Sequence, residues 1–242
     1  MKNIYIDTSE RLCNLISKTE FKDLPLGIYH TQYFDTLLQN LHYYANIYAK
    51  CFSLLDNDTP LQDIICVDYG GGCGLLSIYA KLLGIGTVIY IDINPLSVNA
   101  AEHIFKRVGY SADIVLKGDA STLKSWCKTS NIHPTSLVST DVIEHIYDLD
   151  DFFNTLRQIK PDMQMVFTTA SVADNPFKSH RLHKIMKKCE RNYFAQRLDY
   201  IQNKFPDIQK PQALEYAGQT RGLIYQDIDA VILGKSTTPT ID

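Results

Sequence analysis

The most informative segment of the sequence is "VDYGGGCGLL", residues 67–76, where four of the five positions from Gly70 to Gly74 are glycine. An apolar run precedes it, and the helix-forming segment "LLSIYAKLLG" follows it. A glycine-rich turn from a strand into a helix lets a ligand lie against the backbone, because no side chain holds it away. The stretch therefore predicts a ligand site at the N-terminus of a helix.

Short β-rich runs alternate with helical segments from residue 64 onward. The runs are "IICVDY" (64–69), "TVIYID" (87–92), "ADIVLK" (112–117), "TSLVST" (135–140) and "QMVFTTA" (164–170). One intervening helix has Asn94 as its predicted N-cap, Pro95 at its first position and Gly109 at its end. Strands that alternate with helices predict an α/β fold with a doubly wound, mostly parallel sheet.

The segments on both sides of this core have helical periodicity. Apolar and aromatic residues at helical spacing over 28–55 predict one or two helices, and 179–205 and 211–223 predict two more. The run 228–235 fits either a strand or the end of a helix. We expect three parts: a helical extension or lid over 1–58, a ligand-binding α/β core over 59–176, and a mainly helical C-terminal segment over 177–242.

Composition narrows the partners and the compartment. The chain has 242 residues and a net charge of -3, which disfavours nucleic acid as a partner because no overall charge attracts phosphates. The longest apolar stretch, residues 82–91, is half of the roughly 20 residues that span a bilayer, so we expect no membrane partner. The six cysteines form no C-x-x-C pair, which favours reduced thiols and a cytoplasmic location.

Two classes of ligand use such a glycine turn: dinucleotides and S-adenosylmethionine. The dinucleotide fingerprint requires Gly or Ala at a third site, where this chain has Leu75 or Ser77, depending on the register. A carboxylate at Asp68 would repel a pyrophosphate, whereas it suits a ligand whose nearby end is an ammonium group. The residues favour S-adenosylmethionine.

The sequence resembles the class I S-adenosylmethionine-dependent methyltransferases over about residues 60–172. The stretch from Asp68 to Gly74 fits the acidic-x-G-x-G-x-G loop of that family, and "IYIDINP" and "KGDAST" fit its later segments in order and spacing. The resemblance implies a Rossmann-like methyltransferase fold with S-adenosylmethionine as cofactor. The cofactor-binding residues that it implies are Asp68, Gly70, Gly72, Gly74, Asp92, Ile93, Asp119 and Ala120.

Each implied residue has a role. The glycines leave space for the methionine part of the cofactor, and Asp68 binds its amino group directly or through water. Asp92, beside Ile93, accepts hydrogen bonds from both ribose hydroxyls, while Asp119 and Ala120 contact the adenine. The residues also allow plainer roles: Asp68 as the cap of a tight turn, Asp92 as the acid at the start of a helix, and Asp119 as a turn acid.

The segment "STDVIEHIYDLDDFFNTLRQIKP", residues 139–161, resembles the branch of the family that contains the ubiquinone-biosynthesis O-methyltransferases. It places Asp141, Glu144 and His145 after the fourth strand, beside the point where the strand order of a doubly wound sheet reverses. His145 is the expected base, because an unperturbed imidazole titrates near neutrality; the alternative is a surface histidine that only orders the loop. The expected reaction is methyl transfer to an oxygen or nitrogen of a small-molecule acceptor.

Other possibilities remain open at this stage. Small-RNA 2'-O-methyltransferases, which use magnesium, loosely resemble the pattern Asp141-x-x-Glu144-His145 followed by His180 or His183, but no second matching block is present and we expect no metal. His30 or Tyr33, in an aromatic N-terminal set, contacts the cofactor as part of a lid, or the set packs in the core. The alternatives are an RNA-terminus or protein acceptor, with or without a metal that assists catalysis, and a non-catalytic cofactor-binding subunit. The long C-terminal helix leaves a homodimer open.

The family ends its sheet with an antiparallel hairpin of two further strands. After residue 172 this chain has at most one convincing strand, the run 228–235. Either the hairpin is hidden in an atypical sequence, or helices replace it. Because the acceptor pocket often includes this region, the departure bears on the substrate.

Overall fold

The computed structural model describes residues 3–55, 58–169, 176–223 and 225–235. The chain divides into two compact units, residues 1–170 and residues 171–242, which are described separately below. Over the described ranges, no helix combines the length and the apolar character that crossing a membrane requires.

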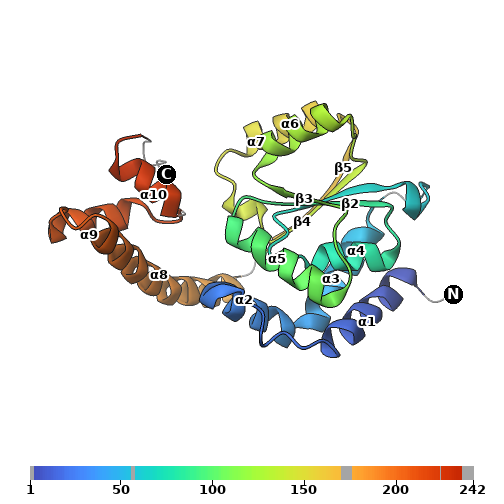
Figure 1. Cartoon of the computed structure of the whole chain (residues 1–242), viewed down its shortest axis with the longest axis horizontal. Helices are drawn as coiled ribbons and strands as arrows, with labels where there is room; N and C mark the ends of the chain where they lie inside the picture. The colour runs from blue at the N-terminus through green and yellow to red at the C-terminus, as the bar shows by residue number, and fades with distance from the viewer. Residues whose placement is uncertain (1–2, 56–57, 170–175, 224, 236–242) are drawn as a thin grey trace. The chain divides into compact units, whose positions relative to one another are not determined.

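A five-stranded sheet forms the centre of the first unit (Figure 1). Its strands are β1 (Ile65–Tyr69), β2 (Thr87–Asp92), β3 (Ile114–Lys117), β4 (Ser136–Thr140) and β5 (Gln164–Thr168). The order is β3-β2-β1-β4-β5 and every pair is parallel, so the predicted doubly wound sheet is confirmed. The strand order reverses between β1 and β4, which places a crevice at the carboxyl ends of these two strands.

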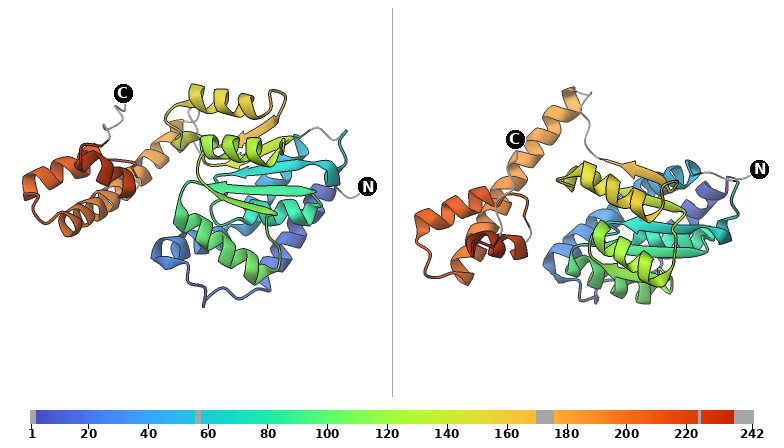
Figure 2. Two further views of the ribbon diagram at one scale, coloured as in Figure 1. Left: turned by 45° about the horizontal axis from the view of Figure 1, so that its top comes forward. Right: turned by 90° about the horizontal axis from the view of Figure 1, so that it is seen from above.

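Helices cover both faces of the sheet (Figures 1 and 2). One face carries α4 (Leu75–Leu83) and α5 (Pro95–Val108), with α1 (Ile4–Ser17), α2 (Gly27–Gln39) and α3 (Leu41–Ser53) packed on the same side. The other face carries α6 (Ala120–Ser130) and α7 (Leu149–Ile159). Successive residues of a strand point to opposite faces, so Cys66 joins the first core and Val67 the second.

Local signals begin and end these helices where the sequence predicts. The Asn94 side chain accepts a hydrogen bond from the Leu96 backbone N–H at 3.0 Å and caps α5, which ends at Gly109 with φ 77°. A short 3-10 turn, η1 (Leu61–Asp63), precedes β1, and a second, η2 (Ile143–His145), follows β4. The second turn is part of the crevice described below.

The second unit consists, over its described residues, of three helices: α8 (Pro176–Lys204), α9 (Lys210–Gln219) and α10 (Tyr225–Ile232). The run 228–235, for which the sequence allowed a strand, lies largely in α10. Its Ile228 is fully buried in a small core with Ile201, and Tyr225 stacks on Tyr200 with ring centroids 4.1 Å apart. Helices thus stand, in the part of the chain that the structure describes, where the family has its last two strands.

Candidate active site

A pocket of about 450 Å³ opens at the carboxyl ends of β1, β2 and β4. The lining comes from the glycine loop, the ends of these strands, the start of α5, the turn η2, and the helices α2 and α3. The lining residues are His30, Tyr33, Leu37, Tyr44, Tyr48, Gly70, Gly72, Asp92, Asn94, Ser97, Thr140, Asp141, Glu144 and His145. Seven of the twelve predicted site residues are among them. The other five, Asp68, Gly74, Ile93, Asp119 and Ala120, are not part of this lining.

Hydrogen bonds hold the glycine loop in place. The backbone N–H groups of Gly70 and Gly71 donate to the Ile91 carbonyl at 2.8 and 3.2 Å. The Gly72 N–H donates to Asp92 Oδ2 at 2.9 Å, and the Tyr90 hydroxyl donates to the Gly72 carbonyl at 2.7 Å. The loop is therefore anchored to β2 by contacts within the protein, which preorganises it for a ligand.

Different contacts explain why the four loop positions are occupied by glycine. A Cβ would lie 2.5 Å from Val142 at Gly70, 2.4 Å from Tyr90 at Gly71 and 2.4 Å from Phe105 at Gly74, all far inside contact distance. At Gly72 the nearest atoms belong to Tyr33 at 3.5 Å, an ordinary contact, and both residues line the pocket. Packing within the protein thus accounts for three of the glycines, and the space beside Gly72 belongs to the pocket.

Asp92 lies at the end of β2 with 8% of its surface exposed. Its Oδ1 accepts a hydrogen bond from the Asn94 N–H at 2.8 Å, and its Oδ2 accepts the bond from Gly72. A carboxylate has about four acceptor positions, so each oxygen can accept another donor from the pocket. Burial raises the pKa of Asp92, while these two hydrogen bonds and the nearby His30 act in the opposite direction.

Asp68 lies beneath the loop. It is 2% exposed, and its Oδ2 accepts a hydrogen bond from the Ser77 hydroxyl at 2.6 Å. Burial raises the pKa of Asp68 to about 7; the Ser77 hydrogen bond lowers it and the charge of Asp92 raises it further. Over the described residues, no ion pair to a basic side chain compensates this carboxylate.

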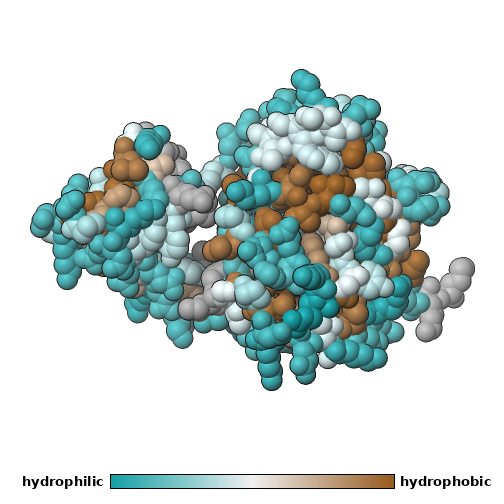
Figure 3. All heavy atoms as spheres, viewed as in Figure 1, coloured by the Kyte–Doolittle hydropathy of each residue, from teal (hydrophilic) through white to brown (hydrophobic). Residues whose placement is uncertain are grey.

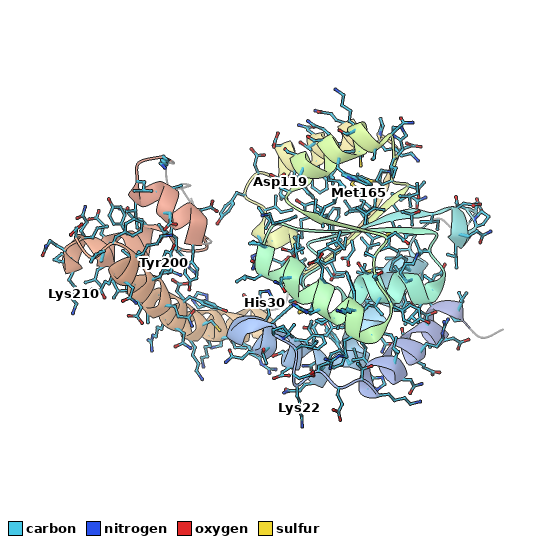
Figure 4. All side chains as sticks on the ribbon, in the orientation of Figure 1. Lys22, His30, Asp119, Met165, Tyr200 and Lys210 are labelled. Carbon is cyan, nitrogen blue, oxygen red and sulfur yellow. The ribbon has the colours of Figure 1, made fainter. Side chains whose placement is uncertain are left out.

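Asp119 caps a helix. Its Oδ1 accepts hydrogen bonds from the Thr122 backbone N–H at 2.9 Å and from the Thr122 hydroxyl at 3.2 Å, so it caps α6. Figure 4 shows Asp119 and His30 well apart in the first unit, with Asp119 on the loop that leads into α6. Ile93 is 60% exposed. Contacts of Asp119, Ala120 and Ile93 with adenine stay a prediction.

The three predicted catalytic residues come together at one wall of the pocket. Asp141 follows β4 with φ 57°, a left-handed conformation that is strained for a residue other than glycine. Glu144 and His145 lie in η2, and both are exposed. With Asp92 they give the pocket three carboxylates, and Tyr33, Tyr44 and Tyr48 add aromatic rings. Such a lining favours a cationic group.

Ser97 is a site residue that the sequence motifs do not reveal, and it lies beside His30 of the N-terminal aromatic set. His30 of α2 is 2% exposed, and its Nε2 lies 3.0 Å from the Ser97 hydroxyl in the first turn of α5. Burial lowers the pKa of His30, and the charge of Asp92 opposes the shift. The only sequence signal for Ser97 is its spacing, since it stands three residues after Asn94 and thus on the same face of the helix.

His180 and His183 lie in the second unit, on exposed positions of α8. Among the side chains that the structure describes, no three His, Cys, Asp or Glu residues are grouped so that they could hold a metal ion.

Comparisons with known proteins agree with this geometry. Residues 48–143 match the sequence model of a family described as ribosomal protein L11 methyltransferase. The proteins of that name from Staphylococcus epidermidis and Ralstonia nicotianae are 32% identical over 110 residues and 43% identical over 54 residues. These alignments cover 45% and 22% of this chain, but 33% and 18% of the relatives. The chain thus spans a third or less of the length of these relatives.

A solved structure of a proposed RNA methyltransferase from Pyrococcus horikoshii aligns with 78% of this chain and 81% of its own, with 16% identity and a TM-score of 0.42. A likeness at that level says nothing about function.

The fold, the glycine loop and the sequence matches point to one class: the first unit has the Rossmann-like architecture of class I S-adenosylmethionine-dependent methyltransferases, and residues 48–143 match a methyltransferase family. Within that class, the particular proteins to which its central segment is similar are the ribosomal protein L11 methyltransferases. The ubiquinone-biosynthesis branch, which residues 139–161 suggested, receives no support from these matches.

The expectation of a small-molecule acceptor is wrong. The curated relatives are named for a ribosomal protein, so the acceptor that their names give is a protein. The error has a physical cause: the resemblance rests mainly on the cofactor-binding segments of the fold, and these segments do not determine the acceptor.

Proposed function

We propose that this protein transfers a methyl group from S-adenosylmethionine to an amino group of a protein. The observation that carries the proposal is one pocket in which the glycine loop and Asp92 meet the acidic and aromatic wall of Asp141, Glu144 and Tyr44. The names of the matched relatives support a protein acceptor. The negative lining favours nitrogen over oxygen, because an amine reaches the site as a cation.

The residues fit the cofactor in three ways. The space beside Gly72 would receive the methionine part, and the remaining lone pairs of Asp92 would accept the two ribose hydroxyls. Asp68 would hold a negative charge beneath the methionine ammonium, with Gly71 between them. When bound, the cofactor supplies an electrophilic methyl group on a sulfonium.

The acceptor side of the pocket would then bind the amino group through Asp141 and the tyrosine rings. An ammonium cannot attack, so it must lose a proton before its nitrogen forms a bond to the methyl carbon and the carbon–sulfur bond breaks. We assign that proton to the His145 imidazole, which lines the pocket and is exposed to solvent that can carry the proton away.

Calorimetric titration with S-adenosylhomocysteine tests the cofactor, and NAD serves as the parallel control. We expect S-adenosylhomocysteine, the product of the cofactor, to bind with a Kd in the micromolar range or tighter, and NAD not to bind. Binding of NAD alone would reject the proposal. Product binding without methyl transfer to any protein fraction would favour a non-catalytic subunit.

His145→Ala should lower kcat by about 100-fold or more, since general bases contribute roughly 10² to 10⁴ in rate. Cofactor affinity should stay unchanged, because His145 faces the acceptor side. The measurement is methyl transfer under saturating cofactor, beside a calorimetric Kd. An unchanged kcat would return His145 to a role in ordering the loop.

A further inference from the structure

The first half of α8 carries a continuous basic face. It consists of Arg181, Lys184, Lys187, Lys188 and Arg191, all of which are exposed. At 3.6 residues per turn, these five positions lie within an arc of roughly 120° on the helix and span about 15 Å along it. In Figure 3 the visible surface of α8 is predominantly hydrophilic.

The carboxylates that the structure describes in the second unit do not pair with this face. The acid nearest in sequence, Glu190, forms ion pairs with Arg197 and with Arg221, the latter at 3.5 Å. Asp229 pairs with Lys204 in the same way. No ion pair among the described residues involves any of the five side chains of the basic face.

The net charge of the chain conceals a difference in charge between its two units. Residues 1–170 contain 13 Lys and Arg and 19 Asp and Glu, whereas residues 171–242 contain 11 and 8. The two units therefore have formal charges of -6 and +3, which together give the -3 of the whole chain. The overall charge, which disfavoured nucleic acid as a partner, is an average of two opposite values.

We propose that the basic face of α8 binds the phosphate backbone of nucleic acid. Duplex nucleic acid carries about one negative charge per 1.7 Å of axis, so a stripe of this length faces several phosphates at once. Cations on a single helix face without a specific pocket bind phosphates in general and read no sequence.

An anionic membrane is the competing partner for a basic helix. Helices that bind membranes bury a broad apolar face beside the basic one. The large apolar residues that the structure shows exposed on α8 are Ile185 and Tyr193, at 48% and 45%. Among the side chains of α8 that the structure describes, these two half-exposed groups make a small apolar surface beside five cations, so the phosphate backbone is favoured.

Fluorescence anisotropy of the full chain with labelled 24-nucleotide RNA, single-stranded and duplex, tests the proposal. The variant carries Lys184→Gln, Lys187→Gln and Lys188→Gln, and glutamine preserves helix propensity. The matched control carries Lys18→Gln, Lys22→Gln and Lys50→Gln, three exposed lysines of the first unit. We expect the α8 variant to bind at least about tenfold more weakly at 0.1 M salt and to lower the slope of log K against log salt by about 2 to 3.

The control should bind RNA as the wild type does. Equal losses in both triple variants, or no binding of RNA by the wild type at 0.05 M salt, would overturn the proposal. So would binding of vesicles of phosphatidylserine and phosphatidylcholine with no binding of RNA. Circular dichroism melts establish that both variants fold, and an unchanged Kd for S-adenosylhomocysteine separates this inference from the proposed methyl transfer, on which it does not depend.

Discussion

Asp68→Asn should make the ligand-free protein more stable at pH 8 while it weakens cofactor binding. The Asp68 carboxyl is 2% exposed and has a pKa of about 7, against an ordinary value of 3.8. Burial without a cation is the main cause, because a desolvated carboxylate lacks the stabilisation that water gives it. The asparagine has nearly the same shape and carries no charge at any pH.

The direction of the pH dependence follows from the raised pKa. Between pH 4 and pH 7 the folded state holds the Asp68 proton more tightly than the unfolded state does. The contribution of this group to the free energy of unfolding is therefore complete below pH 4 and is lost as pH rises through 7. The loss totals about 4 kcal/mol. We would measure the free energy of unfolding by denaturant at pH 5 and at pH 8. The difference between variant and wild type should shift by about 2.5 kcal/mol in favour of the variant from pH 5 to pH 8.

Cofactor affinity supplies the second half of this prediction. If the buried charge holds the methionine ammonium, Asp68→Asn should raise the Kd for S-adenosylhomocysteine about tenfold, or 1.4 kcal/mol. The wild-type Kd should fall as pH rises through 7, since the carboxylate then ionises. A Kd that does not differ between variant and wild type would mean that Asp68 only caps the turn.

Asp119→Asn is the matched control. Asp119 caps α6 outside the pocket lining, and asparagine caps a helix as well as aspartate does. We expect unfolding free energy within about 0.5 kcal/mol of the wild type at both pH values. A marked loss of cofactor affinity in this control would instead support the adenine contact that the family resemblance implies.

Gly72→Val should abolish cofactor binding, with at least a 100-fold rise in Kd, or about 2.7 kcal/mol. A side chain at this position would occupy the space between the loop and Tyr33, where the methionine part of the cofactor is proposed to lie. The φ of 53° adds backbone strain of about 1 to 2 kcal/mol, so some loss of stability is expected as well.

Gly109→Val separates these two effects. Gly109 ends α5 with φ 77°, and a Cβ there would meet no atom within 4 Å. The strain is therefore similar while the pocket is untouched. Thermal melts should show comparable destabilisation of both variants, whereas calorimetry should show normal binding in Gly109→Val alone. Normal binding in Gly72→Val would exclude close approach of the cofactor at this glycine.

Local sequence patterns were sufficient to predict the α/β core. Patterns of period 2 and 3.6, an Asn-Pro helix start and glycines at helix ends are local signals, and β2 spans the predicted residues 87–92. The motif after β4 likewise located Asp141, Glu144 and His145 at the pocket, because parallel strands place their carboxyl ends at one edge of the sheet.

Tertiary structure decided what local patterns cannot encode. Glycine is required at Gly74 because of Phe105 and at Gly70 because of Val142, two residues far along the chain. Beside Gly72 the tertiary structure leaves the space of the pocket. The helical state of residues 228–232 depends on burial of Ile228 against Ile201, and the pairing of His30 with Ser97 depends on how α2 packs on α5. Each of these is set by long-range packing, which overrides or completes the short-range preferences that a sequence displays.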